Sequence, residues 1–284
     1  MNPQWNATKI GIRRGWREWL ISLRNPGDVT YTILGIVVGI VVVYLYRDDT
    51  PLPGVATPMA VYVLASILAV QVVFTSAYAL ATVLSTERED GTLLRMKSLP
   101  CGLRAYTTGL IVRSLLEFAA TAAITILLAA VILWPGFALS AVDVLILLGV
   151  LSLGIVALTA FGFVIGSLFR SPRAVGGWGL VVAGALVWVS GLIQPLSTMA
   201  PWVQILGQAS PLYWMGLGIR SSLLPDEFVV IEIGDEWRLG LVFLVLIGWA
   251  VAGLILAPAL LSRMARRETV ASVEQGRQRA LQRV

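Results

Sequence analysis

The sequence predicts an all-α membrane protein with six transmembrane helices, and three observations support this. Of its 284 residues, 57% are hydrophobic and only 13% are charged, about half the charged share of a typical soluble domain. The apolar residues form continuous runs, whereas a membrane β-barrel needs short alternating segments. The basic residues gather on alternate connections between these runs. Lipid is therefore the solvent expected for most of the chain.

The expected spans are six apolar runs at about 29–46, 59–84, 106–133, 144–169, 175–194 and 239–261. A helix of roughly 20 residues crosses about 30 Å of hydrocarbon, so each run is near or above the required length. The chain is accordingly divided into a cytoplasmic amphipathic helix at 1–27, a transmembrane domain at 28–262 and a basic cytoplasmic tail at 263–284.

The basic residues predict which way the chain faces. With both termini in the cytoplasm, 18 of the 21 Lys and Arg residues lie on the cytoplasmic side, and the exceptions are Arg47, Arg220 and Arg238. An excess of Lys and Arg on cytoplasmic connections is the rule for proteins that cross a bilayer. Topology thus explains the net charge of +5 better than nucleic-acid binding does. We expect a multi-pass protein of the cell membrane with both termini inside.

Residues 5–24 predict an amphipathic helix before the first span. Its apolar face carries, at helical spacing, Ile12, Trp16, Trp19, Leu20 and Leu23. Such a helix should lie along the cytoplasmic leaflet with its tryptophans among the headgroups, and Asn25-Pro26-Gly27 should end it. No small-residue cleavage pattern follows the first apolar run, which indicates a retained anchor. The helix is either a plain anchor or also a contact for a cytoplasmic partner.

The connection between the second and third spans is the most unusual segment. Residues 86–100 hold three acids and three bases between two runs that are long enough to cross a bilayer. A charged, amphipathic helical connection is typical of a docking element for a soluble partner, and a solvated loop is the alternative. Gly91 favours a bend, since Gly lowers helix stability by about 1 kcal/mol relative to Ala.

The longest external connection, 195–237, is apolar and aromatic at its start and acidic at its end. Pro201 predicts a short helix at 202–208, and Ser210-Pro211 predicts a second helix that ends at Pro225. We expect these helices to dip into the outer leaflet, because they are rich in Trp, Tyr and Leu.

The sequence lacks most of the residues and motifs on which catalytic and metal-binding sites depend. It has no histidine and a single cysteine, Cys101, which argues against histidine-based catalysis, the usual zinc sites and an internal disulfide. It lacks the phosphate-binding loop G-x-x-x-x-G-K-[ST]. Arg113 and Glu117, four residues apart, are interpreted as an intrahelical ion pair, with a role in transmitting motion across a dimer interface as the alternative. We expect no catalytic residue, no metal site and no cofactor in this chain.

Three patterns, in this order along the chain, resemble ATP-binding-cassette (ABC) exporter permeases of the second type. The first is Glu87-Arg-Glu-Asp-Gly91-Thr92-Leu, which is similar to the E-x-x-x-G-T-L segment between spans two and three of that family. The second runs from Ser190-Gly191 to Gln204 and is similar to its S-G-x-x-x-P stretch and the external helix after it. The third is Ser210-Pro211-Leu-Tyr213 followed by Arg220, similar to the family's N-P … Y … R pattern with Ser in place of Asn. The resemblance covers about residues 10–262 and extends to daunorubicin-resistance-type multidrug permeases.

The resemblance implies a transporter of two permease copies and two separate cytoplasmic ATPase subunits, which would bind the ATP and Mg²⁺. Segment 86–100 would be the coupling helix seated in a cleft of the ATPase, through Glu87, Arg88, Glu89, Asp90, Gly91, Thr92 and Arg95. The acids would face one surface, while Leu93, Leu94 and Met96 would hold the segment against the membrane domain or the ATPase. ATP-driven closure of the ATPase pair would move this segment as a rigid lever.

The resemblance also implies three further groups of functional residues. The helix before span one would be the connecting helix beside the ATPase, through Arg13, Trp16, Arg17 and Trp19. Candidate residues of the substrate path are Tyr62, Phe74, Phe161, Trp178, Trp188 and Gln194, for each of which lipid or helix packing is the alternative. The external gate would include Trp202, Pro211, Tyr213 and Arg220.

The leading hypothesis is the permease of an exporter of hydrophobic or amphipathic compounds such as drugs, antibiotics or lipids, working as a homodimer. Export of a lipid-linked polysaccharide is the alternative within this class, although it predicts a wider and more polar channel. A secondary transporter or channel usually carries ionisable groups at mid-membrane or inverted repeats, and neither is evident. A membrane scaffold would not need the pattern at 86–100.

Overall fold

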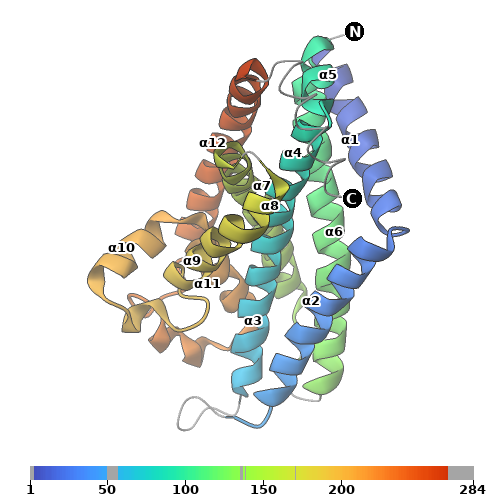
Figure 1. The fold of residues 1–284 in the computed structure, drawn as a ribbon. Helices are drawn as coiled ribbons and strands as arrows, with labels where there is room; N and C mark the ends of the chain where they lie inside the picture. The colour runs from blue at the N-terminus through green and yellow to red at the C-terminus, as the bar shows by residue number, and fades with distance from the viewer. Residues whose placement is uncertain (1–2, 50–56, 135–136, 138, 170, 268–284) are drawn as a thin grey trace.

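The computed structural model describes residues 3–49, 57–134, 137, 139–169 and 171–267 (Figure 1). Across these residues the chain is helical and forms no strand. Six helical stretches are long and apolar enough to cross a membrane: Pro26–Leu45, Met59–Glu89, Gly102–Ile132, Ala141–Leu168, Pro172–Val189 and Leu239–Met264. The prediction of an all-α protein with six spans is confirmed.

The first half of the chain supplies three spans and two shorter helices. Its elements are α1 (Pro3–Ser22), α2 (Pro26–Leu45), α3 (Met59–Val72), the π turn η1 (Val73–Tyr78), α4 (Ala79–Glu89), α5 (Thr92–Ser98) and α6 (Gly102–Ile132). The predicted break between α1 and α2 is confirmed. Asn25 caps α2 by accepting a hydrogen bond from the Gly27 amide, and Pro26 occupies the first helical turn, where its missing N–H costs nothing.

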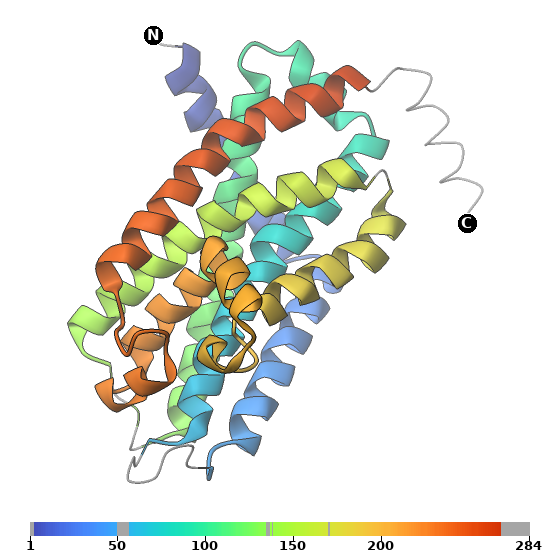
Figure 2. The same ribbon diagram turned by 90° about the vertical axis from the view of Figure 1, so that its left-hand side faces the viewer.

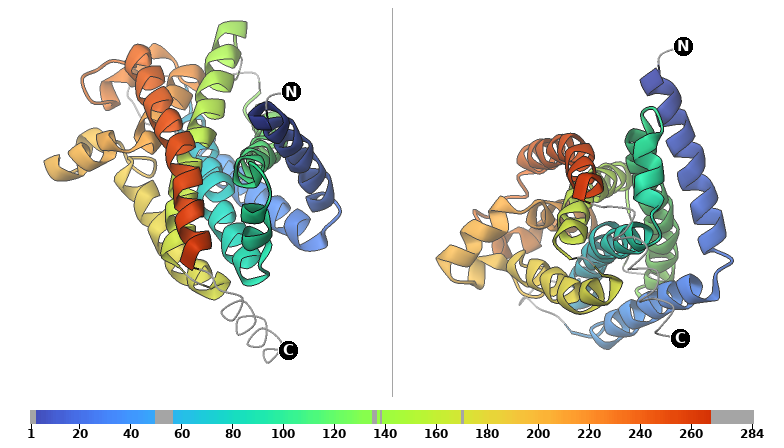
Figure 3. Two further views of the ribbon diagram at one scale, coloured as in Figure 1. Left: turned by 90° about the horizontal axis from the view of Figure 1, so that it is seen from above. Right: turned by 45° about the horizontal axis from the view of Figure 1, so that its top comes forward.

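The second half supplies three more spans and a group of short helices between the last two. Its elements are α7 (Ala141–Leu168), α8 (Pro172–Ala174), the π turn η2 (Val175–Gly179), α9 (Leu180–Val189), η3 (Leu196–Thr198), α10 (Pro201–Ala209), α11 (Pro211–Leu223), η4 (Asp226–Ile231) and α12 (Leu239–Arg267). We call residues 190–238 the cap. The long α12 runs beside α7 (Figure 2), and α1 and α10 lie on opposite sides of the bundle (Figure 3).

The second and fifth spans each contain a π turn, and the two turns lie against each other. A Cβ atom on Gly179, the last residue of η2, would lie 3.7 Å from the ring of Tyr78, the last residue of η1. Gly162 of α7 packs on η1 so closely that a Cβ atom there would come within 2.9 Å of the Ala77 carbonyl oxygen. The wider π turn presents its backbone to this neighbour, and such turns are frequent at functional sites.

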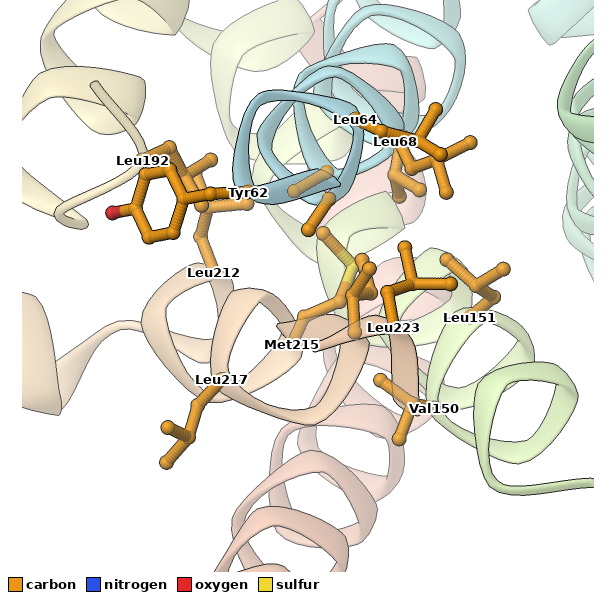
Figure 4. Close-up of a cluster of buried hydrophobic side chains, with 14 of the residues drawn as sticks. Tyr62, Leu64, Leu68, Val150, Leu151, Leu192, Leu212, Met215, Leu217 and Leu223 are labelled. Carbon is orange, nitrogen blue, oxygen red and sulfur yellow. The ribbon is translucent and has the colours of Figure 1, made fainter. Parts of the chain in front are cut away.

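The larger hydrophobic core is centred on α11. Residues 211–220 are all buried, and α11 packs against α3, α7 and α12. Figure 4 shows Met215 of α11 near Leu223 and facing the α3 side chains, with Val150 of α7 close by. Gly218 permits this closeness, because a Cβ atom there would lie 2.7 Å from Val150. The predicted helix is present, but it packs inside the protein rather than dipping into the outer leaflet.

A second, smaller core lies at the α5 end of the bundle. It joins α4, α5, α6, α7 and α12, and its buried members are Leu80, Leu84, Leu93, Tyr106, Leu110, Phe163, Ala257, Leu261 and Met264. The α5 end therefore has hydrophobic packing of its own, separate from the core around α11.

The two longest spans are much longer than a bilayer requires. Met59–Glu89 and Gly102–Ile132 have 31 residues each, which is about 46 Å of helix against about 30 Å of hydrocarbon. The 20-residue α2 just matches the hydrocarbon, and Asp28 in its first turn lies 3.6 Å from Arg113 of α6. The part of α6 before Arg113 therefore extends past the start of α2. Figure 1 shows α4 and α5 at the same end.

Candidate functional site at the α5 end

The segment predicted to dock a partner is bent rather than one continuous helix. The helix of the second span continues to Glu89, and Gly91 then adopts a left-handed conformation with φ of 73° before α5 begins. Cys101, with φ of 54°, makes a second left-handed turn between α5 and α6. Glycine adopts this conformation without strain, which explains its presence at the first turn. The predicted bend at Gly91 is confirmed, and α5 is a short arm between two tight turns.

Leu93 anchors α5 to the bundle. Its side chain is buried in the smaller core with Leu84 of α4, Tyr106 of α6 and Leu261 of α12. Burying a leucine contributes about 1.5–3 kcal/mol, so α5 is held firmly against the ends of three longer helices. The α5 arm therefore packs on all three of them.

An ion pair connects α1 to the end of the second span. The Nη2 atom of Arg14 lies 3.0 Å from Oε1 of Glu87, and its Nε atom donates to Glu18 one turn further along α1. The guanidinium also stacks over the ring of Tyr106, 4.7 Å from its centroid. Burial opposes the charge of Arg14, but the Glu18 and Glu87 carboxylates outweigh it and raise its pKa above the ordinary value. Arg14 is therefore a permanent cation between two helices.

Close backbone contact along α6 fixes α1 in place. A Cβ atom on Gly11 would lie 2.6 Å from the Ala105 carbonyl oxygen, and one on Gly15 would lie 2.5 Å from that of Gly109. These contacts run in the same direction along both helices, so α1 stands beside the first turns of α6 (Figure 1). The glycines of α1 thus bring the backbones of the two helices together.

A second charged cluster lies where α2 starts. Arg113 lies 3.7 Å from Glu117 on its own helix and 3.6 Å from Asp28 of α2. The predicted intrahelical pair is present, and it also includes a residue of a second span. The cluster joins α2 to α6 just below the contact between α1 and α6.

Some of the predicted coupling residues are turned into the protein, and others are exposed. Glu87 is turned inward to Arg14 with 22% of its side chain exposed, and Arg88 is buried. Glu89, Gly91 and Thr92 are half-buried, whereas Asp90 and Arg95 are exposed. In the connecting helix, Arg13, Trp16 and Arg17 are exposed and Trp19 is half-buried. The sequence reasoning missed Arg14 and Tyr106 as members of this site; the i, i+4 spacing of Arg14 and Glu18 was the one available signal.

The predicted path residues do not converge within one chain. Tyr62 is buried, with 2% exposure, against the cap. The ring of Phe74 meets that of Tyr78 edge-on, and the ring of Phe161 contacts that of Trp249 of α12 at a tilt. The remaining three, Trp178, Trp188 and Gln194, are exposed.

The predicted gate residues lie in the cap and around a buried ion pair. Arg220 of α11 donates from Nε and Nη2 to the two carboxylate oxygens of Glu232, at 2.5 and 3.1 Å. Both side chains are 2% exposed, and the Tyr62 ring lies on the guanidinium, 5.6 Å from its carbon. Burial opposes the charge of Arg220, but Glu232 raises its pKa above the ordinary value. Pro211 is buried, whereas Trp202 of α10 is exposed.

Tyr213 of α11 is hydrogen-bonded to the last residue of the cap, just before α12. Its hydroxyl oxygen accepts a hydrogen bond of 2.7 Å from Arg238. Burial and the nearby Glu232 raise the pKa of Tyr213, so the hydroxyl stays protonated. The predicted helices at 202–208 and after Pro211 are confirmed as α10 and α11.

Comparison with models of known protein families identified the family of this chain. The model of the family described as ABC-2 type transporter matches residues 14–224, which include α5, both π turns and most of the cap. The comparison with curated proteins found no match.

Proposed function

Since the chain belongs to the ABC-2 type transporter family and is a multi-pass membrane permease, we propose that it is the membrane half of an ATP-driven exporter of hydrophobic or amphipathic compounds. Two copies would work with two separate ATPase subunits, which bind the ATP and Mg²⁺. The α5 end would face the cytoplasm, as the distribution of Lys and Arg predicts.

One observation carries the coupling part of this proposal. The α5 arm projects at the end of the bundle, and Leu93 fastens it to α4, α6 and α12. The Arg14–Glu87 pair adds α1 to the same unit. An ATPase that pushes on α5 would move the ends of four helices together, which is the rigid-body type of switch.

The second span offers a route from α5 to the cap. Its α4 part ends beside α5, η1 lies against the π turn of the fifth span, and α3 packs against α11. A tilt of α4 would therefore reach both π turns before it reaches Tyr62 and the buried Arg220–Glu232 pair. We propose that this is how nucleotide-driven motion opens the outer side.

Apolar or amphipathic cargo fits the composition of the spans. In the described spans, the Asp, Glu, Lys and Arg residues lie in the first or last turns, except Arg113 and Glu117. These two lie near the middle of the long α6, where Arg113 is level with Asp28 in the first turn of α2. Aromatic pairs such as Phe74–Tyr78 and Phe161–Trp249 lie further in. A secondary transporter would place ionisable groups at mid-membrane, so this distribution favours the exporter.

The test is reconstitution. The permease would be purified with a cassette ATPase from the same organism, placed in vesicles with the ATPase outside, and supplied with a lipophilic fluorescent dye. We expect ATP-dependent dye accumulation that stops with an ATPase unable to hydrolyse ATP. Failure to form any complex with that ATPase, or dye movement that ignores ATP, would contradict the proposal.

A further inference from the structure

Two buried side chains, one in the cap and one beside it, each keep a hydrogen-bonding atom without a protein partner. Nη1 of Arg220 and the hydroxyl oxygen of Tyr62 have no hydrogen-bond partner among the residues that the structure describes. Arg220 is 1% exposed and Tyr62 is 2% exposed, so bulk water does not reach either group. An unpartnered polar group costs free energy when it is buried, and a charged one costs more. Two such groups in contact therefore form a candidate binding site.

The two groups border the same part of the larger core. The Tyr62 ring lies over the guanidinium of Arg220, 5.6 Å from its carbon. Gly216 lies next to Nη1, because a Cβ atom there would be 3.1 Å from Nη1 and 2.6 Å from the Leu192 side chain. Figure 4 shows Leu192 near the Tyr62 ring, and both belong to the larger core. The missing side chain of Gly216 thus leaves Nη1 uncovered on the side where Leu192 and Tyr62 lie.

The chemistry of these groups determines which ligand they can hold. A guanidinium nitrogen is only a donor, and a phenol hydroxyl can donate its proton. One oxygen atom with two lone pairs can accept from both. Glu232 already accepts from Nε and Nη2 of Arg220, so the ion pair is neutral. An anion would add a buried charge without compensation, and the two donors therefore fit a neutral oxygen.

We propose that Tyr62 and Arg220 bind a neutral oxygen acceptor, which joins α3 of the second span to α11 of the cap. Two sources supply this chemistry: an internal water molecule, and the hydroxyl or carbonyl oxygen of a hydrophobic compound. The second source rests on the function proposed above, and it specifies that the transported compounds carry such an oxygen. The site itself requires no ATPase, so it can be tested on the permease alone.

The sign of one substitution tests the site. Tyr62→Phe removes the hydroxyl and little else. If that hydroxyl donates to a bound oxygen, its loss lowers the melting temperature; if it is unpartnered, its loss removes a cost and the melting temperature stays the same or rises. With the oxygen present, we expect the variant to melt about 2–4 °C below wild type in phosphatidylcholine nanodiscs. Tyr31→Phe, on an exposed side chain of α2, is the control and should leave the melting temperature unchanged.

Gly216→Ala supplies a second, independent measurement. Its methyl group would lie 3.1 Å from Nη1 and cover the donor. With the ligand excluded in this way, Tyr62→Phe should change the melting temperature much less than it does in wild type. If the effects of the two substitutions simply add, the hydroxyl and Nη1 do not share a ligand, and the inference is wrong.

A pair of probes separates the two sources of the oxygen. Cyclohexanol and methylcyclohexane have similar shapes, but only cyclohexanol carries an oxygen. If the ligand is water, wild type and Tyr62→Phe differ without any addition, and cyclohexanol does not widen the difference. If the ligand is a hydrophobic compound, the difference develops with cyclohexanol and not with methylcyclohexane. Comparing the two proteins in the same nanodiscs cancels any effect of the probes on the lipid.

Two results would overturn the inference. One is a melting temperature of Tyr62→Phe at or above that of wild type, both without addition and with cyclohexanol. The other is a loss of stability when gluconate replaces chloride, seen in wild type and not in Tyr62→Phe, since the ligand would then be an anion. Neither measurement involves the ATPase, so the proposed function is tested separately by ATP-dependent dye accumulation.

Discussion

Two ion pairs join different elements of the chain: Arg14 pairs with Glu87, 73 residues away, and Arg220 pairs with Glu232, 12 residues away. The first is partly exposed and connects α1 to α4, where motion would enter. The second is fully buried in the cap, where motion would leave. Each pair therefore allows one step of the proposed mechanism to be tested by a single substitution.

Glu87→Gln should uncouple the permease while leaving it folded. Gln keeps the size of the side chain but removes the charge that faces Arg14, so α1 no longer moves with α4. We expect dye transport per ATP hydrolysed to fall several-fold, with hydrolysis itself retained. A double-mutant cycle that combines Glu87→Gln with Arg14→Gln should give a coupling energy of about 1–2 kcal/mol in the free energy of unfolding, measured by thermal unfolding. Glu236→Gln, on an exposed acid of the cap, is the control, and equal uncoupling by it would reject the role of the pair.

Glu232→Gln should strongly destabilise the cap. Removing one partner leaves the Arg220 cation buried without compensation, which typically costs about 3–5 kcal/mol. We expect a clear drop in the melting temperature of the purified permease, together with faster proteolysis between α10 and α12. Glu227→Gln, an exposed acid of η4, serves as the control. An unchanged melting temperature for Glu232→Gln would show that the pair adds nothing to stability.

At the scale of elements, short helices and tight turns decide how the bundle ends. The turn at Gly91 directs α5 away from the axis of the second span, and the glycines of α1 bring that helix onto α6. Both features depend on a glycine, which has no side chain. Substitutions that add a side chain at these glycines therefore test whether the backbone geometry is needed.

Gly91→Ala should weaken the α5 arm. An L-residue in the left-handed conformation costs about 1–2 kcal/mol, so the turn should relax and α5 should leave its place in the smaller core. We expect reduced ATPase stimulation by the permease with little loss of insertion. Gly91→Asn is the matched control, since Asn tolerates this conformation. If both variants behave alike, the turn is not what positions α5.

Gly15→Leu should separate α1 from α6. The nearest atom to an added Cβ is a backbone oxygen of Gly109, which cannot rotate away, and overpacking of this kind typically costs about 1–3 kcal/mol. Faster proteolysis within residues 3–22 would report the separation. Gly184→Leu on α9, where no atom lies within 4 Å of the added Cβ, should have no such effect.

The elements that could be predicted from the sequence are those fixed locally. Continuous apolar runs identify the spans, Pro201 and Pro211 begin α10 and α11, and Gly91 marks the bend. The burial of α11 could not be predicted, because an apolar helix has the same pattern whether it faces lipid or protein. The π turns and the Arg14–Glu87 pair depend on neighbours more than 70 residues away, such as Gly162 for η1.

At the scale of the whole molecule, one hydrophobic core lies at the α5 end of the bundle and a larger one lies around α11, next to the cap. The smaller core holds α5 and the extended ends of the longer helices, and the larger core holds α11. The second, third, fourth and sixth spans contribute side chains to both cores, so these four spans can relate one end to the other. This arrangement allows the α5 end to be studied by substitution without disturbing the packing around α11.

The tight turn at Cys101 has a practical consequence for chemical labelling. The only thiol of the chain is exposed and sits at the junction of α5 and α6. A maleimide fluorophore or a spin label can therefore be attached to the wild-type protein without removing other cysteines. In a two-permease assembly the same reaction supplies a symmetric pair of probes, whose separation in each nucleotide state can be followed spectroscopically.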